Sequence, residues 1–327
     1  MKIHFFERNP ADGQVSIEKL FSVIKKELSR KGVAYSVFVN PFKLSEMLKT
    51  LMYFKKNQGE INHITGDIHW SSLALDSRKT LLTVHDLSGY YQHTGLKKKL
   101  YYLLWIYLPL KKLRYITVIS EKTKKEISWL LPSVASKIKV IPNCITVDIL
   151  PIKFKDFSKM KLLIVGTREN KNIEKVLEAC KDLNIALSIV GRLNERQSRL
   201  LEDYQYDFSN YINISDEKLR ELYDESNVLC FPSTYEGFGL PILEAQARNC
   251  MVITSDLSPM KDVAGKGALL VNPHHTEEIR NAVLRIANEE DLRRELVIRG
   301  QENVKNYTPD WVVEQYTELY KKILANK

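Results

Sequence analysis

The sequence predicts an α/β protein built from two doubly wound domains, each with a parallel β-sheet flanked by helices. Short apolar, β-branched runs alternate with helical patterns along the chain, which is typical of βαβ units and parallel sheets. The length of 327 residues exceeds one ordinary domain and suits two of about 150 residues each. The apolar fraction of 44% is that of a globular chain and supplies two cores.

The first half of the chain supplies one set of alternating elements. Its expected strands are residues 2–6, 33–39, 61–65, 80–86, 115–120 and 137–143. Between the first two lies a predicted helix with one apolar face, formed by Ile17, Leu20, Phe21, Ile24 and Leu28. We expect residues 1–150 to form the first domain.

The second half repeats the pattern. Its expected strands are residues 161–166, 185–191, 211–214, 227–231, 251–255 and 268–271. Residues 148–159 break the alternation, contain Pro151 and are the predicted linker, so the second domain should span residues 151–307. A last helix is predicted over residues 308–327, where Thr308 suits the N-cap and Pro309 the first helical position. Its expected apolar face is Trp311, Val312, Tyr316, Leu319, Tyr320 and Ile323.

Charge is unevenly distributed between the halves. Residues 1–150 hold 24 Lys and Arg against 12 Asp and Glu, whereas the remainder is slightly acidic. This asymmetry suggests an anionic partner such as nucleic acid, a membrane surface or a phosphorylated substrate, with a merely soluble basic surface as the alternative. Residues 97–114 place an aromatic-rich apolar centre between lysine clusters, too short to span a bilayer. They fit an interfacial helix or a buried helix with basic ends.

The four cysteines (Cys144, Cys180, Cys230 and Cys250) are scattered without a C-x-x-C pair, which fits reduced thiols in a cytoplasmic protein. The seven histidines form no ligand-spaced set, so no metal site is expected. The apolar run at the N-terminus is too short for a signal peptide.

The strongest functional motif is residues 231–249, where a strand ends and a helix begins. Gly237 and Gly239 let the backbone turn tightly beside the helix N-terminus, which makes an anion site suited to a diphosphate or a sugar hydroxyl. Glu244 lies about one turn into the helix, where its carboxylate can accept both hydroxyls of a ribose, and Glu236 in the loop can reach a sugar. The alternative is a capped helix with two solvated glutamates.

A second motif follows the strand that ends at Gly166. Arg168 and Lys171 lie in the turn before the next helix, where two cations suit a diphosphate leaving group. Two solvated cations are the alternative.

In the first half, candidate cleft residues stand at strand ends or in the first loop. They are His85, Asp86, Asp67, Ser120 and, in residues 9–16, Gly13. A core or loop histidine is the alternative reading of His85.

From about residue 160 onward the sequence resembles the retaining GT-B glycosyltransferases of family 4. The resemblance rests on residues 232–245 (PSTYEGFGLPILEA) and on their flanks, 214–231 and 251–273. It implies two Rossmann-like domains facing across a cleft, with the last helix crossing back to the first domain. The implied activity moves a sugar from a nucleotide-diphosphate sugar to a glycan or lipid-linked acceptor, with retention of configuration. Surface polysaccharide or glycoconjugate synthesis at the cytoplasmic face of a membrane is the implied setting.

The resemblance also implies roles for individual residues. Glu244 would hold the ribose, Glu236 and His85 the donor sugar, and Lys171 with Arg168 the diphosphate. Backbone amides would bind sugar or phosphate, namely those of Gly237, Phe238, Gly239 and Leu240. No metal cofactor is expected, because the chain has no D-x-D motif and the two cations would replace the ion. The chain departs from the pattern at Asn170, where the family often has arginine, and in having Gly13 alone in the first loop.

The sequence disfavours two other functions and leaves a third open. A dinucleotide-dependent oxidoreductase needs G-x-G-x-x-G after the first strand of a domain, but in the partial match that begins at Gly237 the third glycine position holds Ile242 and the match follows a late strand. A nucleic-acid-binding protein lacks any recognised motif here. A non-catalytic sugar-nucleotide-binding relative of the same fold stays open, because only an activity assay separates it from the enzyme.

Overall fold

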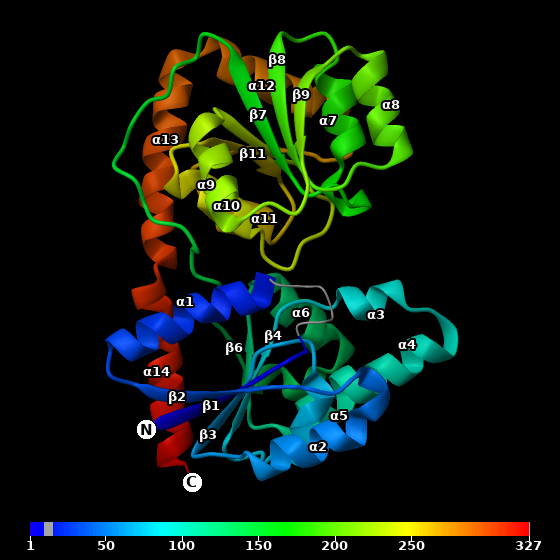
Figure 1. Cartoon of the computed structure of the whole chain (residues 1–327), viewed down its shortest axis with the longest axis vertical. Coiled ribbons are helices and arrows are strands. Elements are labelled where there is room, and N and C mark those ends of the chain that lie inside the picture. The colour runs from blue at the N-terminus through cyan, green and yellow to red at the C-terminus, as the bar shows by residue number, and fades with distance from the viewer. Residues whose placement is uncertain (10–15, 327) are drawn as a thin grey trace. The chain divides into compact units, whose positions relative to one another are not determined.

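The computed structural model describes residues 1–9 and 16–326, so Gly13 lies outside the described residues. The chain divides into two units: unit 1 is Met1–Thr146 with Thr308–Lys327, and unit 2 is Val147–Tyr307 (Figure 1). Each unit has one six-stranded sheet in which every strand pair is parallel. The predicted α/β class with two doubly wound sheets is confirmed.

The sheet of unit 1 has the strand order β2-β1-β3-β4-β5-β6. Its strands are β1 (Lys2–Glu7), β2 (Ala34–Val39), β3 (Ile61–Ile64), β4 (Thr80–Val84), β5 (Tyr115–Val118) and β6 (Ile138–Val140). Its α-helices are α1 (Ser16–Arg30), α2 (Met47–Lys56), α3 (Ser88–Gln92), α4 (Gly95–Tyr101), α5 (Leu108–Lys112), α6 (Glu121–Leu130) and α14 (Pro309–Ala325). Shorter turns are η2 (Leu44–Glu46), η3 (His69–Ala74), the π-helical η4 (Tyr102–Tyr107) and η5 (Pro132–Lys137).

Successive strand residues of unit 1 face two separate cores, because side chains alternate across a strand. Leu81 of β4 packs with α1 and α14, whereas Leu82 packs on the opposite face with α2, η4 and α5. The Thr308 side chain caps α14 by accepting a hydrogen bond from the Trp311 amide at 3.4 Å, as the sequence predicted. Trp311 itself is 40% exposed, so its place on the buried face was wrong, and Val313 is buried instead.

Residues 97–114 fall on α4, η4, α5 and the turn that follows, so this stretch is a helix with a π-helical middle rather than one regular α-helix. Ile106 and Leu110 are buried against the sheet, whereas Leu96, Leu100 and Leu103 are exposed. One side of the segment is therefore buried, as the second interpretation predicted, and the other side is exposed to solvent. Within the part of the chain that the structure describes, no helix is long and apolar enough to cross a membrane.

The sheet of unit 2 has the order β12-β11-β10-β7-β8-β9. Its strands are β7 (Met160–Val165), β8 (Ile185–Val190), β9 (Asp207–Tyr211), β10 (Val228–Phe231), β11 (Met251–Ser255) and β12 (Leu269–Val271). Its α-helices are α7 (Ile173–Cys180), α8 (Glu195–Asp203), α9 (Asp216–Glu225), α10 (Leu240–Ala247), α11 (Met260–Ala264), α12 (Thr276–Asn288) and α13 (Glu290–Val304). Two short turns are η6 (Glu169–Lys171) and η7 (Lys305–Tyr307).

The strand expected at 211–214 was wrong, since β9 precedes it at 207–211. β9 is an edge strand that pairs only with β8, and most of its residues are exposed. Because β9 is mostly exposed, its residues need not alternate between apolar and polar. Its sequence DFSNY therefore did not predict a strand.

The strand order of unit 2 reverses direction between β7 and β10. From β7 the chain builds outward through β8 and β9, and then returns to add β10 on the other side of β7. The connections that leave β7 and β10 therefore diverge from neighbouring strand ends. Such a switch point at the carboxyl edge is where doubly wound sheets bind ligands.

Candidate functional site

The β7 loop (residues 166–172) begins at a glycine that the geometry requires. Gly166 has φ +91°, a conformation that side chains disfavour, and a Cβ there would lie 2.9 Å from Cε of Lys171. The Lys171 side chain therefore crosses directly over the Gly166 backbone. This close approach brings its ammonium group back to the carboxyl edge of the sheet.

Asn170 connects the β7 loop to the β10 loop (residues 232–239). Its Nδ2 donates to the Tyr235 carbonyl at 2.8 Å and to Glu236 Oε1 at 3.3 Å. Its own carbonyl accepts from the Thr234 amide at 2.8 Å. The residue that departs from the family pattern thus fixes the two loops of the switch point to each other.

Asn172 adds a third connection. It adopts the left-handed conformation at φ +60°, which asparagine tolerates better than most residues. Its Nδ2 donates to the carbonyls of Pro232 at 3.2 Å and Pro273 at 2.6 Å. The β7 loop is thereby fastened to the segments that follow both β10 and β12.

Lys171 and Glu236 form an ion pair at the centre of this arrangement. Nζ of Lys171 lies 2.7 Å from Oε1 of Glu236, and the two side chains are only 18% and 15% exposed. The same ammonium lies 4.4 Å from the ring centroid of Phe231, a cation–π contact. Arg168, in contrast, is exposed, and its side chain makes no hydrogen bond or ion pair with any residue that the structure describes.

The β10 loop ends in the N-terminus of α10. Gly239 is the N-cap with φ +103°, and Pro241 occupies the first turn, where proline is accepted. Phe238 is 5% exposed, and its ring centroid lies 6.0 Å from that of Tyr307. Buried Phe238 anchors the loop, so that the backbone of Gly237 to Leu240 stands at the positive end of the helix dipole.

Glu244, in the second turn of α10, is 4% exposed. The hydroxyl of Tyr223 on α9 donates to its Oε2 at 3.0 Å. Tyr223 is itself fully buried, and burial together with the neighbouring carboxylate raises the pKa of its hydroxyl. Sequence reasoning missed Tyr223, because it reads there as one more apolar position of an amphipathic helix.

The site residues expected in unit 1 lie after β3, β4 and β5. His85 follows β4, and its Nε2 bonds the Thr65 carbonyl at 2.8 Å. Since a carbonyl can only accept, Nε2 carries the proton, and Nδ1 of the neutral ring is left as an acceptor. Burial lowers the pKa of His85 to about 4. The next residue, Asp86, accepts hydrogen bonds from the amide and hydroxyl of Ser88.

Two further expected residues have different surroundings. Asp67, after β3, is 51% exposed, and one of its oxygens lies 3.8 Å from Nε2 of His69. Ser120, after β5, caps α6 by accepting from the Thr123 amide at 3.2 Å. Its hydroxyl thus serves the local helix.

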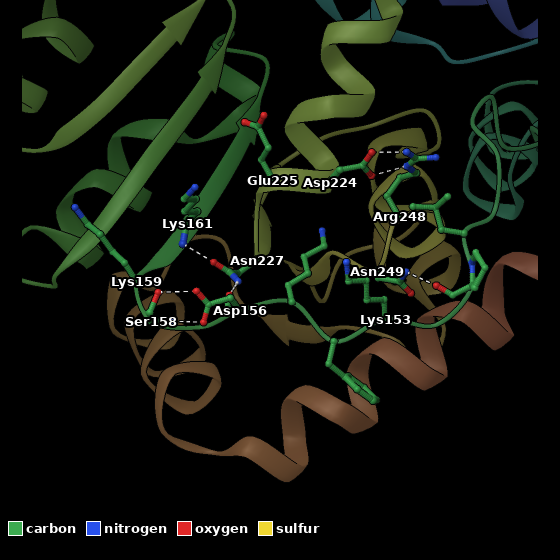
Figure 2. Close-up of a pocket in the computed structure, with 14 residues that line it drawn as sticks. Lys153, Asp156, Ser158, Lys159, Lys161, Asp224, Glu225, Asn227, Arg248 and Asn249 are labelled. Atoms are coloured by element: carbon green, nitrogen blue, oxygen red, sulfur yellow. Dashed lines mark hydrogen bonds and ion pairs between the residues drawn. The ribbon is translucent and has the colours of Figure 1, made fainter.

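A hollow of about 780 Å³ lies elsewhere in unit 2, between the linker and the amino ends of β7, β10 and β11 (Figure 2). It is bordered by lysines of the linker and by an ion pair between Arg248 and Asp224. Its residues belong to the edge of the sheet opposite the β7 and β10 loops. Among residues 1–9 and 16–326, no group of three or more His, Cys, Asp or Glu side chains is placed to hold a metal ion.

Residues 151–303, which make up nearly all of unit 2, match the family described as glycosyl transferases group 1. Over these residues, unit 2 is similar to the glycosyl transferases group 1 domain. Both the β7 loop and the β10 loop lie within this domain. The match ends before η7 and α14.

Two curated relatives extend the comparison. The O-antigen chain mannosyltransferase RfbU of Salmonella typhimurium is 26% identical over 248 residues, which are 72% of this chain and 70% of RfbU. The O-antigen chain mannosyltransferase B of Escherichia coli is 31% identical over 108 residues, 33% of this chain. That second match spans 28% of the relative's length.

Solved structures resemble the whole chain, including unit 1. Sucrose-phosphate synthase from Thermosynechococcus elongatus aligns with a TM-score of 0.78 and 18% identity over 100% of both chains. Anabaena HepE, in complex with UDP and glucose, aligns with a TM-score of 0.73 and 13% identity over 98% of this chain and 100% of its own. At these identities the likeness establishes the two-domain α/β fold alone.

Proposed function

We propose that the protein is a retaining glycosyltransferase that moves a sugar from a nucleotide-diphosphate donor to a glycan or lipid-linked acceptor in surface polysaccharide synthesis. One observation carries the proposal: the Lys171–Glu236 pair, held beside the N-terminus of α10 at the switch point of unit 2. A cation, a carboxylate and a helix N-terminus at one sheet edge offer groups for a diphosphate and for sugar hydroxyls together.

We assign binding of the diphosphate to Lys171 and Arg168, the two cations of the β7 loop. Negative charge grows on the leaving phosphate as the glycosidic bond breaks, and a fixed ammonium stabilises this charge with little reorganisation. Lys171 is fixed by Glu236 and by the ring of Phe231. Exposed Arg168 is free to reach the distal phosphate. The leaving phosphate then assists front-face attack by the acceptor, and Glu236 is not assigned as a nucleophile.

We assign binding of the nucleoside and the sugar to α10 and to the β10 loop that precedes it. Glu244 accepts the ribose hydroxyls, and the Tyr223 hydrogen bond holds it in the required rotamer. Amides from Gly237 to Leu240 bind phosphate or sugar, and Glu236 takes a sugar hydroxyl. In unit 1, Nδ1 of neutral His85 is the acceptor offered to a hydroxyl of the donor sugar.

Mannose is the sugar we propose first. RfbU and mannosyltransferase B are both named as O-antigen chain mannosyltransferases. The Mycolicibacterium hassiacum relative, 31% identical over 116 residues, is named as an α-(1→4)-mannosyltransferase. These names agree on mannosyl transfer while differing in acceptor.

The test is calorimetric titration of the full chain with mannosyl, glucosyl and galactosyl nucleotides, followed by transfer assays with lipid-linked and free glycan acceptors. We expect one donor to bind, Glu244→Ala to weaken it by about 2–4 kcal/mol, and the product to keep the donor's anomeric configuration. EDTA should leave transfer intact. Inhibition by EDTA that Mn²⁺ reverses would overturn the metal-free mechanism. Donor binding without transfer to any acceptor would favour the non-catalytic alternative.

A further inference from the structure

Unit 1 exposes large apolar side chains on one helical layer. The segment α4–η4–α5 presents Leu96, Leu100 and Leu103 to solvent at 81%, 54% and 42% exposure. These positions recur every three to four residues, so they form one stripe along the segment. The opposite side of the segment is buried through Ile106 and Leu110 in the core. These two residues belong to η4 and α5, whereas α4 reaches this core only through partly buried Tyr101, so the stripe extends from the packed part of the segment into its exposed start.

A second stripe lies on α2. Leu48 and Met52 are 75% and 65% exposed and stand one helical turn apart. Phe54 of the same helix is buried in the core that also holds Ile106 and Leu110. In Figure 1, α2, α4 and α5 lie together on the side of unit 1 away from α1 and α14. Both stripes thus belong to the layer that covers one face of the sheet. We call Leu48, Met52, Leu96, Leu100 and Leu103 the apolar stripes.

The surroundings of the apolar stripes are strongly basic. No acidic residue occurs between Asp86 and Glu121, a stretch that carries five lysines and Arg114. The lysines beside the stripes are Lys55, Lys56, Lys97, Lys98, Lys99, Lys111 and Lys112. None of these seven forms an ion pair with an acidic side chain in the described part of the chain. Lys112 donates to two backbone carbonyls and Lys98 lies over the Tyr90 ring, but no carboxylate of the described residues neutralises any of the seven charges.

We infer that this layer docks unit 1 on an anionic lipid leaflet, with the apolar stripes inserted at headgroup depth and the lysines on lipid phosphates. Leucine and methionine gain free energy on leaving water, and lysines gain from the negative surface potential of such a leaflet. A second copy of the chain is a poorer occupant, because pairing two such faces would bring two uncompensated lysine clusters together. Docking would hold the protein where a lipid-linked acceptor resides.

Vesicle co-sedimentation of the full chain, without donor or acceptor, tests this inference independently of the proposed function. We expect binding to phosphatidylcholine vesicles that contain phosphatidylglycerol, and little binding to phosphatidylcholine alone. Added salt should weaken the binding, because lipid and lysine charges are screened within roughly 10 Å at 0.1 M ionic strength. Equal binding to both vesicle types at all salt concentrations would overturn the electrostatic part.

Substitutions on the apolar stripes separate docking through this surface from nonspecific adsorption to lipid. L96S/L100S should lower the partition coefficient about tenfold or more, and L48S/M52S by a similar factor, because each pair removes two inserted side chains. The matched control is L270S/I298S, which alters side chains of unit 2 that are 44% and 40% exposed. Loss of binding in the control, or unchanged binding in either stripe variant, contradicts the docking surface.

Charge reversals complete the test. K97E/K99E should reduce binding to anionic vesicles about tenfold or more, since each lysine near such a surface contributes about 1 kcal/mol. K26E/K321E changes the net charge equally on α1 and α14, on the other face of the sheet, and should have little effect. Sedimentation velocity without vesicles tests whether a second copy of the chain covers the apolar stripes instead. A dimer that L96S/L100S dissociates would assign the stripes to a second copy and overturn the inference.

Discussion

The two units share one plan, a six-stranded parallel sheet, but place different chemistry at the carboxyl ends of their strands. In unit 2 the edge carries the half-buried Lys171–Glu236 ion pair, fastened by amides of the two asparagines in the β7 loop. In unit 1 the corresponding edge carries neutral His85, with its pKa lowered to about 4, and Asp86, engaged by its own loop. A shared topology thus fixes which edge can hold a site, whereas loop residues decide whether charged or neutral groups stand there.

The largest expected effect concerns α14, which completes unit 1 and is not part of unit 2. Unit 1 uses both ends of the chain, and Tyr316, Tyr320 and Ile323 of α14 are buried in its core. Deleting residues 308–327 should cost several kcal/mol, because each such side chain contributes about 1.5–3 kcal/mol on burial. Unit 2 is continuous and should keep donor affinity.

Urea unfolding and calorimetry measure these two quantities on the truncated chain. Trp311→Ala is the control, because that side chain is 40% exposed and its removal should cost far less than the deletion. A truncated chain that unfolds at the same urea concentration would show that α14 does not stabilise unit 1.

The next effect concerns the charge in unit 2. Lys171→Ala should lower turnover by about 10²–10³-fold, the typical cost of losing a group that stabilises developing charge. Donor affinity should fall less, because phosphate charge grows towards the transition state. Lys175→Ala, in the first turns of α7, is the matched control and should leave turnover unchanged. Equal losses in affinity and turnover would reduce Lys171 to ground-state docking.

Much of the fold and the motif positions could be predicted from sequence, because apolar runs and glycine-rich turns are local signals. The Lys171–Glu236 pair could not, since its members are 65 residues apart and meet only through the strand order of unit 2. Asn170 reads as a lost arginine in the sequence, yet the structure shows it donating to the β10 loop. The role of Tyr223 is hidden for the same reason, because its partner Glu244 lies on another helix.

The apolar stripes show a different limit. Periodicity predicts that a helix has an apolar face, but burial depends on whether another element covers that face. Leu48 and Met52 satisfy the helical pattern as well as Phe54 does, and only the packing of α2 shows which side is covered. A lysine-flanked apolar stripe therefore has the same sequence pattern whether it faces the core or the solvent.

A smaller effect follows from a buried histidine in unit 1. His63 is fully buried between Tyr320 and Thr83, at 2.7 Å from each hydroxyl, and burial lowers its pKa to about 3. The unfolded chain takes up this proton near pH 6.5 and the folded chain only near pH 3, so the stabilisation is present above pH 6.5 and lost as pH falls. His63 alone should contribute about 1.4 kcal/mol per pH unit to the slope, in addition to the contribution of His85, whose pKa is also lowered.

Urea unfolding between pH 7 and pH 5, before most carboxylates titrate, measures this slope. His63→Gln should lower the slope by the His63 share and leave the His85 share, since glutamine takes up no proton. His274→Gln is the control, because that histidine of unit 2 is exposed and should leave the slope unchanged. An unaltered slope in the His63 variant would contradict a neutral buried ring.

The smallest expected effect tests how finely unit 2 positions its carboxylate. Tyr223→Phe keeps the buried ring but removes the hydroxyl that donates to Glu244 Oε2 at 3.0 Å. Losing one hydrogen bond to a charged acceptor should weaken donor binding by about 1–2 kcal/mol and leave turnover at saturating donor nearly unchanged. Calorimetry and steady-state kinetics separate the two quantities. In a Glu244→Gln background, Tyr223→Phe should then cost much less affinity, because both changes act on one interaction. A full additional loss in that background would show that Tyr223 stabilises α9 and α10 without positioning Glu244.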